Sequence, residues 1–230
     1  MLPATLRPAT PRSGRHISLR SVCLILTGAI LTSLICCLAV SCGYLTPGEE
    51  LARQYKRGER DFSLQDFTEI NLSGAQLPGV NMMYSTLYNA AITDADLSGA
   101  NLNGAALHGA DLRSANLSRA DLRTAGFYRA TLDGADLAQA QMAGASLPEA
   151  SLQQANLAGA DLSGADLSKA DLQGADLTAA NLENADLTRT QLRDATLDGA
   201  NLRGTNATEG QIAKARSLRG TILPDGTIHE

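Results

Sequence analysis

Carboxylates are the residues of this chain whose type and spacing most directly suggest chemistry. The stretch "ADLSGADLSKADLQGADL", residues 160–177, places Asp161, Asp166, Asp171 and Asp176 five residues apart. Carboxylates that converge on one point can act as a general acid and base or hold a metal ion. Their chemical role therefore depends on the backbone that positions them.

Histidine and cysteine offer few alternatives for catalysis. His16 and His229 lie near the termini, and only His108 lies in the central part of the chain. No nucleophile, base and orienting group can be assembled around His108 from the sequence. All four cysteines precede residue 43: Cys23, Cys36, Cys37 and Cys42. The sequence therefore predicts no enzyme activity, no cofactor and, in the body of the chain, no disulfide or metal site.

The dominant feature of the sequence is a five-residue repeat. An apolar residue stands at every fifth position from Phe62 to Leu202, and 23 of these 29 positions are Leu. On an α-helix, successive positions of this kind would be about 140° apart, and on a flat strand they would alternate between faces. Only a chain that turns a corner every five residues keeps them all inside. The spacing therefore predicts a solenoid whose coils stack about 4.8 Å apart.

The repeat units resemble the motif of a known family. The units "ADLSG", "ADLQG", "ANLSR" and "ANLRG" are similar to the A(D/N)LXX motif of the pentapeptide-repeat family. The resemblance implies an all-β fold, a right-handed quadrilateral β-helix with four pentapeptides, or 20 residues, per coil. Over residues 60–204 the 29 repeats of this chain then make about seven coils.

In such a solenoid the polar repeat positions have structural roles. Asp or Asn precedes the central apolar residue in 18 of the 29 repeats, where a short polar side chain can bind the turn backbone and stack in an outer ladder. One ladder comprises Asp96, Asn116, Asp136, Asn156 and Asp176. Gly ends 12 of the repeats, which suggests a crowded corner that disfavours a Cβ.

Both ends of the solenoid are expected to carry helices. Residues 43–59 are predicted to form a short helix from Thr46 and Pro47, either covering the first coil or acting as a spacer. Residues 205–230 are predicted to form a helical cap and tail, in which Thr208 and Gln211 make a capping box.

The first 42 residues are interpreted as a signal peptide or transmembrane anchor. Residues 21–42 carry no charge and are long enough for a hydrophobic helix across a bilayer, and an arginine-containing leader precedes them. The end of this segment, "LAVSC", resembles a bacterial lipoprotein signal with Cys42 as the lipid-attachment site. An uncleaved single-span anchor and an ordinary secretory cleavage are the alternatives. In all three cases the repeat region is exported. Lipidation at Cys42 and an uncleaved anchor would also keep it attached to a membrane.

The repeat is least regular between residues 80 and 130. A 20-residue coil stacks Tyr88, His108 and Tyr128 on one face, with Tyr84 and Arg129 at nearby corners. Tyr and Arg are common binding anchors, so these five residues form a predicted partner surface. The structural alternative is that the tyrosines only cover an irregular coil.

Two functions agree with these features. The first is a non-enzymatic, membrane-attached structural or protein-binding rod on the non-cytoplasmic side, with an unknown protein partner and no nucleic acid or small-molecule substrate. The alternative, implied by the family resemblance, is a DNA mimic that inhibits a DNA-binding protein such as gyrase. Residues 60–204 carry 18 acidic and 9 basic side chains, which suits a mimic. The export segment and the arginines around one coil, Arg113, Arg119, Arg123 and Arg129, oppose it.

Overall fold

The structure, a computed structural model, describes residues 45–230. The predicted signal or anchor of residues 1–42, with its hydrophobic segment and Cys42, lies outside the described residues. Residues Pro47–Glu230 form one compact unit. Between residues 45 and 230, no helix combines the length and apolar character that crossing a membrane requires.

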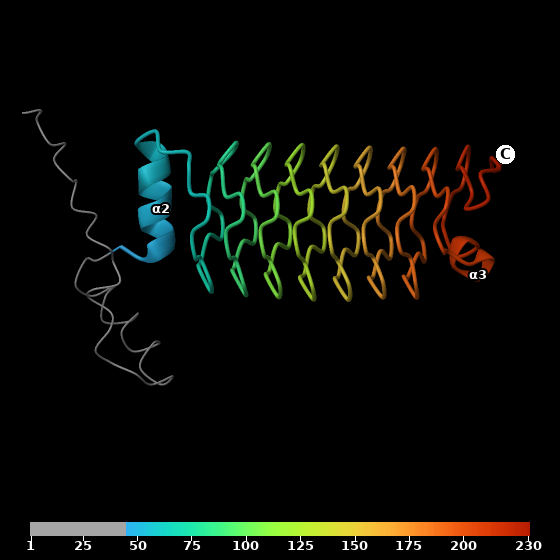
Figure 1. Ribbon diagram of the computed structural model, residues 1–230, viewed down its shortest axis with the longest axis horizontal. Coiled ribbons are helices and arrows are strands. Elements are labelled where there is room, and N and C mark those ends of the chain that lie inside the picture. The colour runs from blue at the N-terminus through green and yellow to red at the C-terminus, as the bar shows by residue number, and fades with distance from the viewer. Residues whose placement is uncertain (1–44) are drawn as a thin grey trace, which may run out of the picture. The chain divides into compact units, whose positions relative to one another are not determined.

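Stacked coils make up most of this unit (Figure 1). Single parallel bridges join residues 20 positions apart, and this register is kept from residue 61 to residue 201. Asp161 and Asn181 form one such bridge: the N–H of Leu162 donates to the carbonyl of Asn181 at 2.7 Å, and the N–H of Asn181 donates to the carbonyl of Ala160 at 2.9 Å. Each coil therefore satisfies the backbone of the next along the rod.

Each repeat ends in a tight turn. The N–H of Ala165 donates to the carbonyl of Leu162 at 3.0 Å, and Gly164 between them has a φ of +63°. The last position of all 29 repeats has a positive φ, and 17 of these positions hold a residue other than Gly. A positive φ at the third residue is the mark of a type II turn.

Crowding does not explain the corner glycines, so that expectation was wrong. At nine of the twelve, an added Cβ would meet no heavy atom closer than 3.4 Å. Gly suits the corner because it adopts a positive φ without steric cost. The exceptions are Gly104, Gly109 and Gly204, where a side chain of the preceding coil occupies the space of the missing Cβ.

The apolar positions of the repeat form one continuous core along the rod. Leu162 is 0% exposed and Ala160, two residues earlier, is 1% exposed, which confirms the predicted inward placement. Phe67 in the first coil is only half-buried. Burying a Leu completely stabilises the fold by about 1.5–3 kcal/mol relative to exposure.

The outer Asp and Asn residues have the predicted structural role. The Asn116 side-chain amide donates to Asp96 Oδ1 at 3.1 Å, and that of Asn156 donates to Asp136 Oδ1 at 2.9 Å. Asp96 Oδ1 also accepts the backbone N–H of Ser98 at 3.0 Å. These carboxylates therefore stabilise turns.

Helix α2, Pro47–Lys56, lies on the first coil (Figure 1). Its Leu51 is buried, and the Tyr55 hydroxyl donates to the carbonyl of Pro78 at 2.5 Å. Gly48 packs against the carbonyl of Asn71 so closely that a side chain would not fit. The predicted helix therefore shields the unpaired edge of this coil.

Helix α3, Glu209–Ile212, caps the other end of the rod through side chains. Gln211 forms the predicted capping box with Thr208, and its amide also donates to the carbonyls of Leu187 at 2.8 Å and Thr190 at 2.9 Å. Asn206 Oδ1 accepts the N–H of Leu187 at 2.6 Å. Side chains thus replace the backbone of a further coil.

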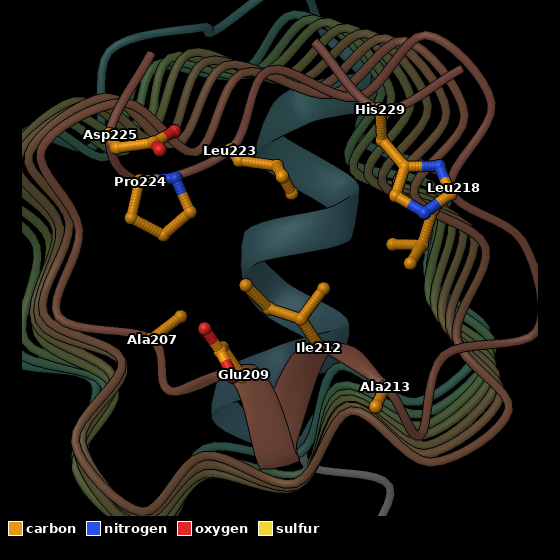
Figure 2. A pocket seen from close by; sticks show the side chains of 9 residues that line it. All are labelled: Ala207, Glu209, Ile212, Ala213, Leu218, Leu223, Pro224, Asp225 and His229. Atoms are coloured by element: carbon orange, nitrogen blue, oxygen red, sulfur yellow. The ribbon is translucent and has the colours of Figure 1, made fainter. Parts of the chain in front are cut away.

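The backbone bridges between coils continue beyond residue 204, but with a shift of one residue. Thr196 pairs with Ser217 and Asn201 with Ile222, each 21 residues away, because the segment containing α3 is one residue longer than a regular repeat allows. Ile222 then pairs antiparallel with Ile228. Here the end of the rod has a largely apolar hollow of ≈ 430 Å³, into which Ile212 and Leu223 project (Figure 2).

Candidate functional site

Three aromatic side chains from successive coils meet on one face of the rod. The Tyr88 and His108 rings are stacked, with centroids 5.3 Å apart and planes 19° apart. The His108 and Tyr128 rings meet edge to face at 6.4 Å. Tyr88 and Tyr128 each keep about two fifths of their surface exposed, at 41% and 40%. Together with Arg129, these three residues are called the aromatic patch below.

His108 is held in place by the coil that follows it. Its ring lies over Gly126, where an added Cβ would meet the imidazole at 2.5 Å. The backbone N–H of Tyr128 donates to His108 Nδ1 at 3.1 Å. Nδ1 therefore acts as an acceptor, which places the proton of a neutral imidazole on Nε2. The ring fills a space that almost any other residue at position 126 would close.

Arg129 extends the patch toward a charged corner. Its guanidinium lies 5.0 Å from the centroid of the Tyr128 ring, and its Nε contacts Glu149 Oε2 at 2.9 Å. Lys169 binds the other carboxylate oxygen of Glu149 at 3.0 Å. Hydrogen bonds from Arg129 and then Lys169 hold the pKa of Glu149 below its ordinary value. This network fixes the position of the Arg129 side chain beside the ring.

A shallow hollow of ≈ 360 Å³ lies over the patch. Asn89 and Gly109 line it as well, and the Asn89 side chain occupies the space of the Cβ that Gly109 lacks. The sequence-based prediction missed Asn89, Gly109 and Gly126. The two glycines could have been found from the 20-residue coil, because Gly109 lies 20 residues after Asn89 and Gly126 lies 18 residues after His108.

Tyr84 does not belong to this group. It is 55% exposed, but its ring lies over Gly104 at another corner and does not line the hollow. Of the five residues in the predicted partner surface, the fold brings together Tyr88, His108, Tyr128 and Arg129.

The ring of positive charge predicted around one coil is partly neutralised. Arg113 binds Asp111 at 2.6 Å and Arg123 binds Asp121 at 2.7 Å, each with a second hydrogen bond to the same carboxylate. The Arg113 and Arg123 guanidinium groups, through these bonds, keep the pKa of each aspartate below its usual range.

Within residues 45–230, no group of three or more His, Cys, Asp or Glu side chains is arranged to hold a metal ion. The aspartates at residues 160–177 come from different faces of one coil, and the N–H groups of Ser163 and Ser168 bind the first two.

The fold defines a β-solenoid of five-residue units with four turns per coil. The profile described as pentapeptide repeats matches in 8 copies, over residues 61–99, 92–127, 125–164, 145–184 and 170–210. The chain belongs to the pentapeptide-repeat family, whose members fold as right-handed β-helices.

Several solved structures of pentapeptide-repeat proteins are similar to this chain. HetL, involved in heterocyst differentiation regulation in the cyanobacterium Nostoc sp. strain PCC 7120, is 32% identical, with 81% of this chain and 100% of HetL covered and a TM-score of 0.46. QnrB1, a plasmid-mediated fluoroquinolone resistance protein, is 18% identical over 72% of this chain and 94% of its own, with a TM-score of 0.43. An Arabidopsis thaliana thylakoid-lumen protein is 22% identical over 65% and 72%, with a TM-score of 0.14. No curated protein sequence matches the chain.

Proposed function

We propose that the protein is a non-enzymatic rod that binds a protein partner through the aromatic patch and is held on the non-cytoplasmic side of a membrane by its N-terminal region. Pentapeptide-repeat proteins are generally structural or protein-binding rather than enzymes. The observation that carries the proposal is the patch itself, a preformed group of partly exposed rings from three successive coils.

The patch has the physical properties of a binding anchor. Tyr and Arg are over-represented among the residues that dominate interface energies, because each combines a large contact area with a hydrogen-bonding group. Tyr88 and Tyr128 are already restrained by His108, so a partner need not order them. A smaller ordering cost leaves more of the contact energy for affinity.

Attachment to a membrane is proposed from the first 42 residues. Lipidation at Cys42 or an uncleaved span of residues 21–42 would each keep the rod at the surface. Mass spectrometry of the native protein separates these forms, since lipidation leaves a modified Cys42 as the new N-terminus. An intact leader on a soluble cytoplasmic protein would remove this part of the proposal.

A DNA-mimic function is the second candidate. The excess of acidic side chains over basic ones along the repeat supports it. The ion pairs of Arg113 and Arg123 interrupt the acidic surface on two faces, which a uniform phosphate-like array would not require. Competition between duplex DNA and the rod for purified gyrase tests this candidate, and inhibition by the rod in the submicromolar range would favour it over the first.

Site-specific photo-crosslinking tests the patch. A photoreactive amino acid replaces Tyr128 in the native membrane, and in a control protein it replaces Gln153 on another face. We expect a crosslinked partner of one defined mass from position 128 and none from position 153, since only the former lies in the patch.

Alanine variants then separate binding from stability. Tyr88→Ala should abolish the crosslink from position 128, whereas Tyr84→Ala, which removes an equally large exposed ring outside the patch, should leave it unchanged. If Tyr88→Ala lowers the unfolding temperature and leaves the crosslink intact, the rings serve the coil and not a partner.

A further inference from the structure

A third hollow lies where the last coil meets α3, away from the aromatic patch and separate from the apolar hollow at the end of the rod. Its volume is ≈ 230 Å³. The residues lining it come from the outer face of this coil and from α3 with the residues that follow: Arg189, Thr190, Gln191, Leu192, Arg193, Gln211 and Lys214. Three of these seven side chains are cationic and none is acidic.

The three cations of this hollow form no ion pair with any described residue. No ion pair and no side-chain hydrogen bond is formed by Arg189, Arg193 or Lys214 within residues 45–230. By contrast, Arg113 and Arg129 in the middle of the rod are both paired with a carboxylate. Three neighbouring cations repel one another unless an anion joins them.

Two backbone N–H groups at the same place also lack an acceptor. One coil earlier, the N–H of Lys169 donates to the carbonyl of Thr188 at 2.8 Å and that of Leu172 to the carbonyl of Gln191 at 2.9 Å. The equivalent N–H groups of Arg189 and Leu192 donate to no acceptor within residues 45–230. Leu192 is 1% exposed, and a buried N–H without a partner is unfavourable.

The one-residue register shift explains why these N–H groups are left over. In a regular coil a strand would follow here, but the chain turns into α3 and the ladder resumes only at Lys214, whose carbonyl accepts the N–H of Asp194 at 2.9 Å. Gln211 Oε1 accepts the backbone N–H and the hydroxyl of Thr208, and the Thr190 hydroxyl donates to the carbonyl of Leu167. Neither side chain supplies the missing acceptor.

We propose that this hollow binds a phosphate dianion, either inorganic phosphate or the terminal group of a phosphate monoester, through Arg189, Arg193, Lys214 and the two free N–H groups. Guanidinium groups bind phosphate oxygens in pairs, and backbone N–H groups add directed hydrogen bonds. Asp194 follows Arg193 in the chain and donates its backbone N–H to the carbonyl of Lys214, but its carboxylate forms no ion pair with either cation. The site does not depend on the aromatic patch or on membrane attachment.

Isothermal titration of the full-length protein in a non-ionic detergent with inorganic phosphate tests the site. The Arg193→Gln/Lys214→Gln double variant should bind phosphate about a hundredfold more weakly, because it removes two charge-assisted hydrogen bonds and each supplies roughly a factor of ten. The matched control, Arg113→Gln/Arg123→Gln, removes the same two charges from the middle of the rod and should bind within about twofold of wild type. If both double variants lose phosphate affinity equally, the loss reflects only the net charge of the protein, and the proposed site is overturned.

Hydrogen exchange provides a second readout that does not depend on a variant. Phosphate should slow exchange at the Arg189 and Leu192 N–H groups and leave Lys169 and Leu172, already bonded within the ladder, unchanged. Saturable binding without protection of these two groups would place the anion elsewhere and refute the site.

Two further titrations identify the source of the phosphate group. Glycerol 3-phosphate, a monoester, should bind as inorganic phosphate does. Glycerophosphoglycerol, the diester that corresponds to the headgroup of phosphatidylglycerol, should bind more weakly because it carries only one negative charge. Tighter binding of the diester would assign the hollow to a lipid headgroup and contradict a dianion site.

Discussion

The left-handed corners lead to a prediction with an unusual sign: replacing Ala179 by Gly should stabilise the rod. Ala179 is exposed and has a φ of +56°. A left-handed conformation costs an L-residue about 1–2 kcal/mol. Removing the Cβ also gives the unfolded chain more freedom, which offsets about 0.4–1 kcal/mol of the gain. The net effect is a stabilisation of about 0.5–1 kcal/mol, or about 1–4 °C in the unfolding temperature.

Two variants make this test specific. Gly164→Ala is the reverse change at a corner where φ is +63° and an added Cβ meets no atom within 4 Å, so it should destabilise by about the same amount for conformational reasons alone. Ala158→Gly, at a half-buried position where φ is not positive, should destabilise by about 0.5–1 kcal/mol.

The assay is urea unfolding of each variant, followed by circular dichroism under identical conditions. The reasoning requires opposite signs for Ala179→Gly and Ala158→Gly. If both alanine-to-glycine changes shift the midpoint in the same direction, the backbone conformation at the corner does not control the preference for Gly. A neutral Gly164→Ala would lead to the same conclusion.

Three further predictions concern the core, the cap and acid stability. Leu162→Asp should unfold at least one coil, because the residue is 0% exposed and a carboxylate there has no partner. A variant as stable as wild type in urea would contradict the inward placement of every fifth residue. Gln211→Ala frees two rod carbonyls and should destabilise by about 1–3 kcal/mol, with faster exchange at the C-terminal end than in the middle of the rod. The bond from Arg113 lowers the pKa of Asp111 in the folded state, so this pair stabilises the protein above the unfolded pKa of about 3.9 and loses that effect as the pH falls through the folded pKa. The difference in unfolding free energy between wild type and Arg113→Gln should therefore shrink on acidification, and a pH-independent difference would exclude the ion pair as its cause.

Much of the fold could be predicted from the spacing alone, because few backbones keep every fifth residue inside. Leu162 is an example: its burial follows from a corner every five residues and needs no knowledge of its neighbours. The Asn116 to Asp96 ladder was predictable for a related reason, since the 20-residue coil implied by the family resemblance places these side chains one above the other.

The ends and corners could not be predicted in the same way. The repeat marks where Gly occurs but not whether its cause is crowding or a positive φ, and the two differ only in the surroundings of the missing Cβ. At the C-terminal end, Asn206 and Gln211 stand in for the backbone of a further coil, and the ladder resumes one residue later. Such substitutions depend on the three-dimensional position of an edge, and no periodicity marks them.

Both binding features proposed for this rod lie where the chain departs from its repeat. A regular coil pairs its backbone with its neighbours and presents similar small side chains on every face, so it has neither free hydrogen-bonding groups nor a distinctive shape. At the aromatic patch, Gly126 replaces the polar residue before Phe127 and makes room for His108, which in turn restrains the tyrosines on either side. At the hollow beside α3, the register shift leaves the N–H groups of Arg189 and Leu192 without acceptors within residues 45–230, next to cations that form no ion pair there. Both features therefore have the same origin, a local break in a repeat whose regular coils bond their backbone N–H and carbonyl groups to one another.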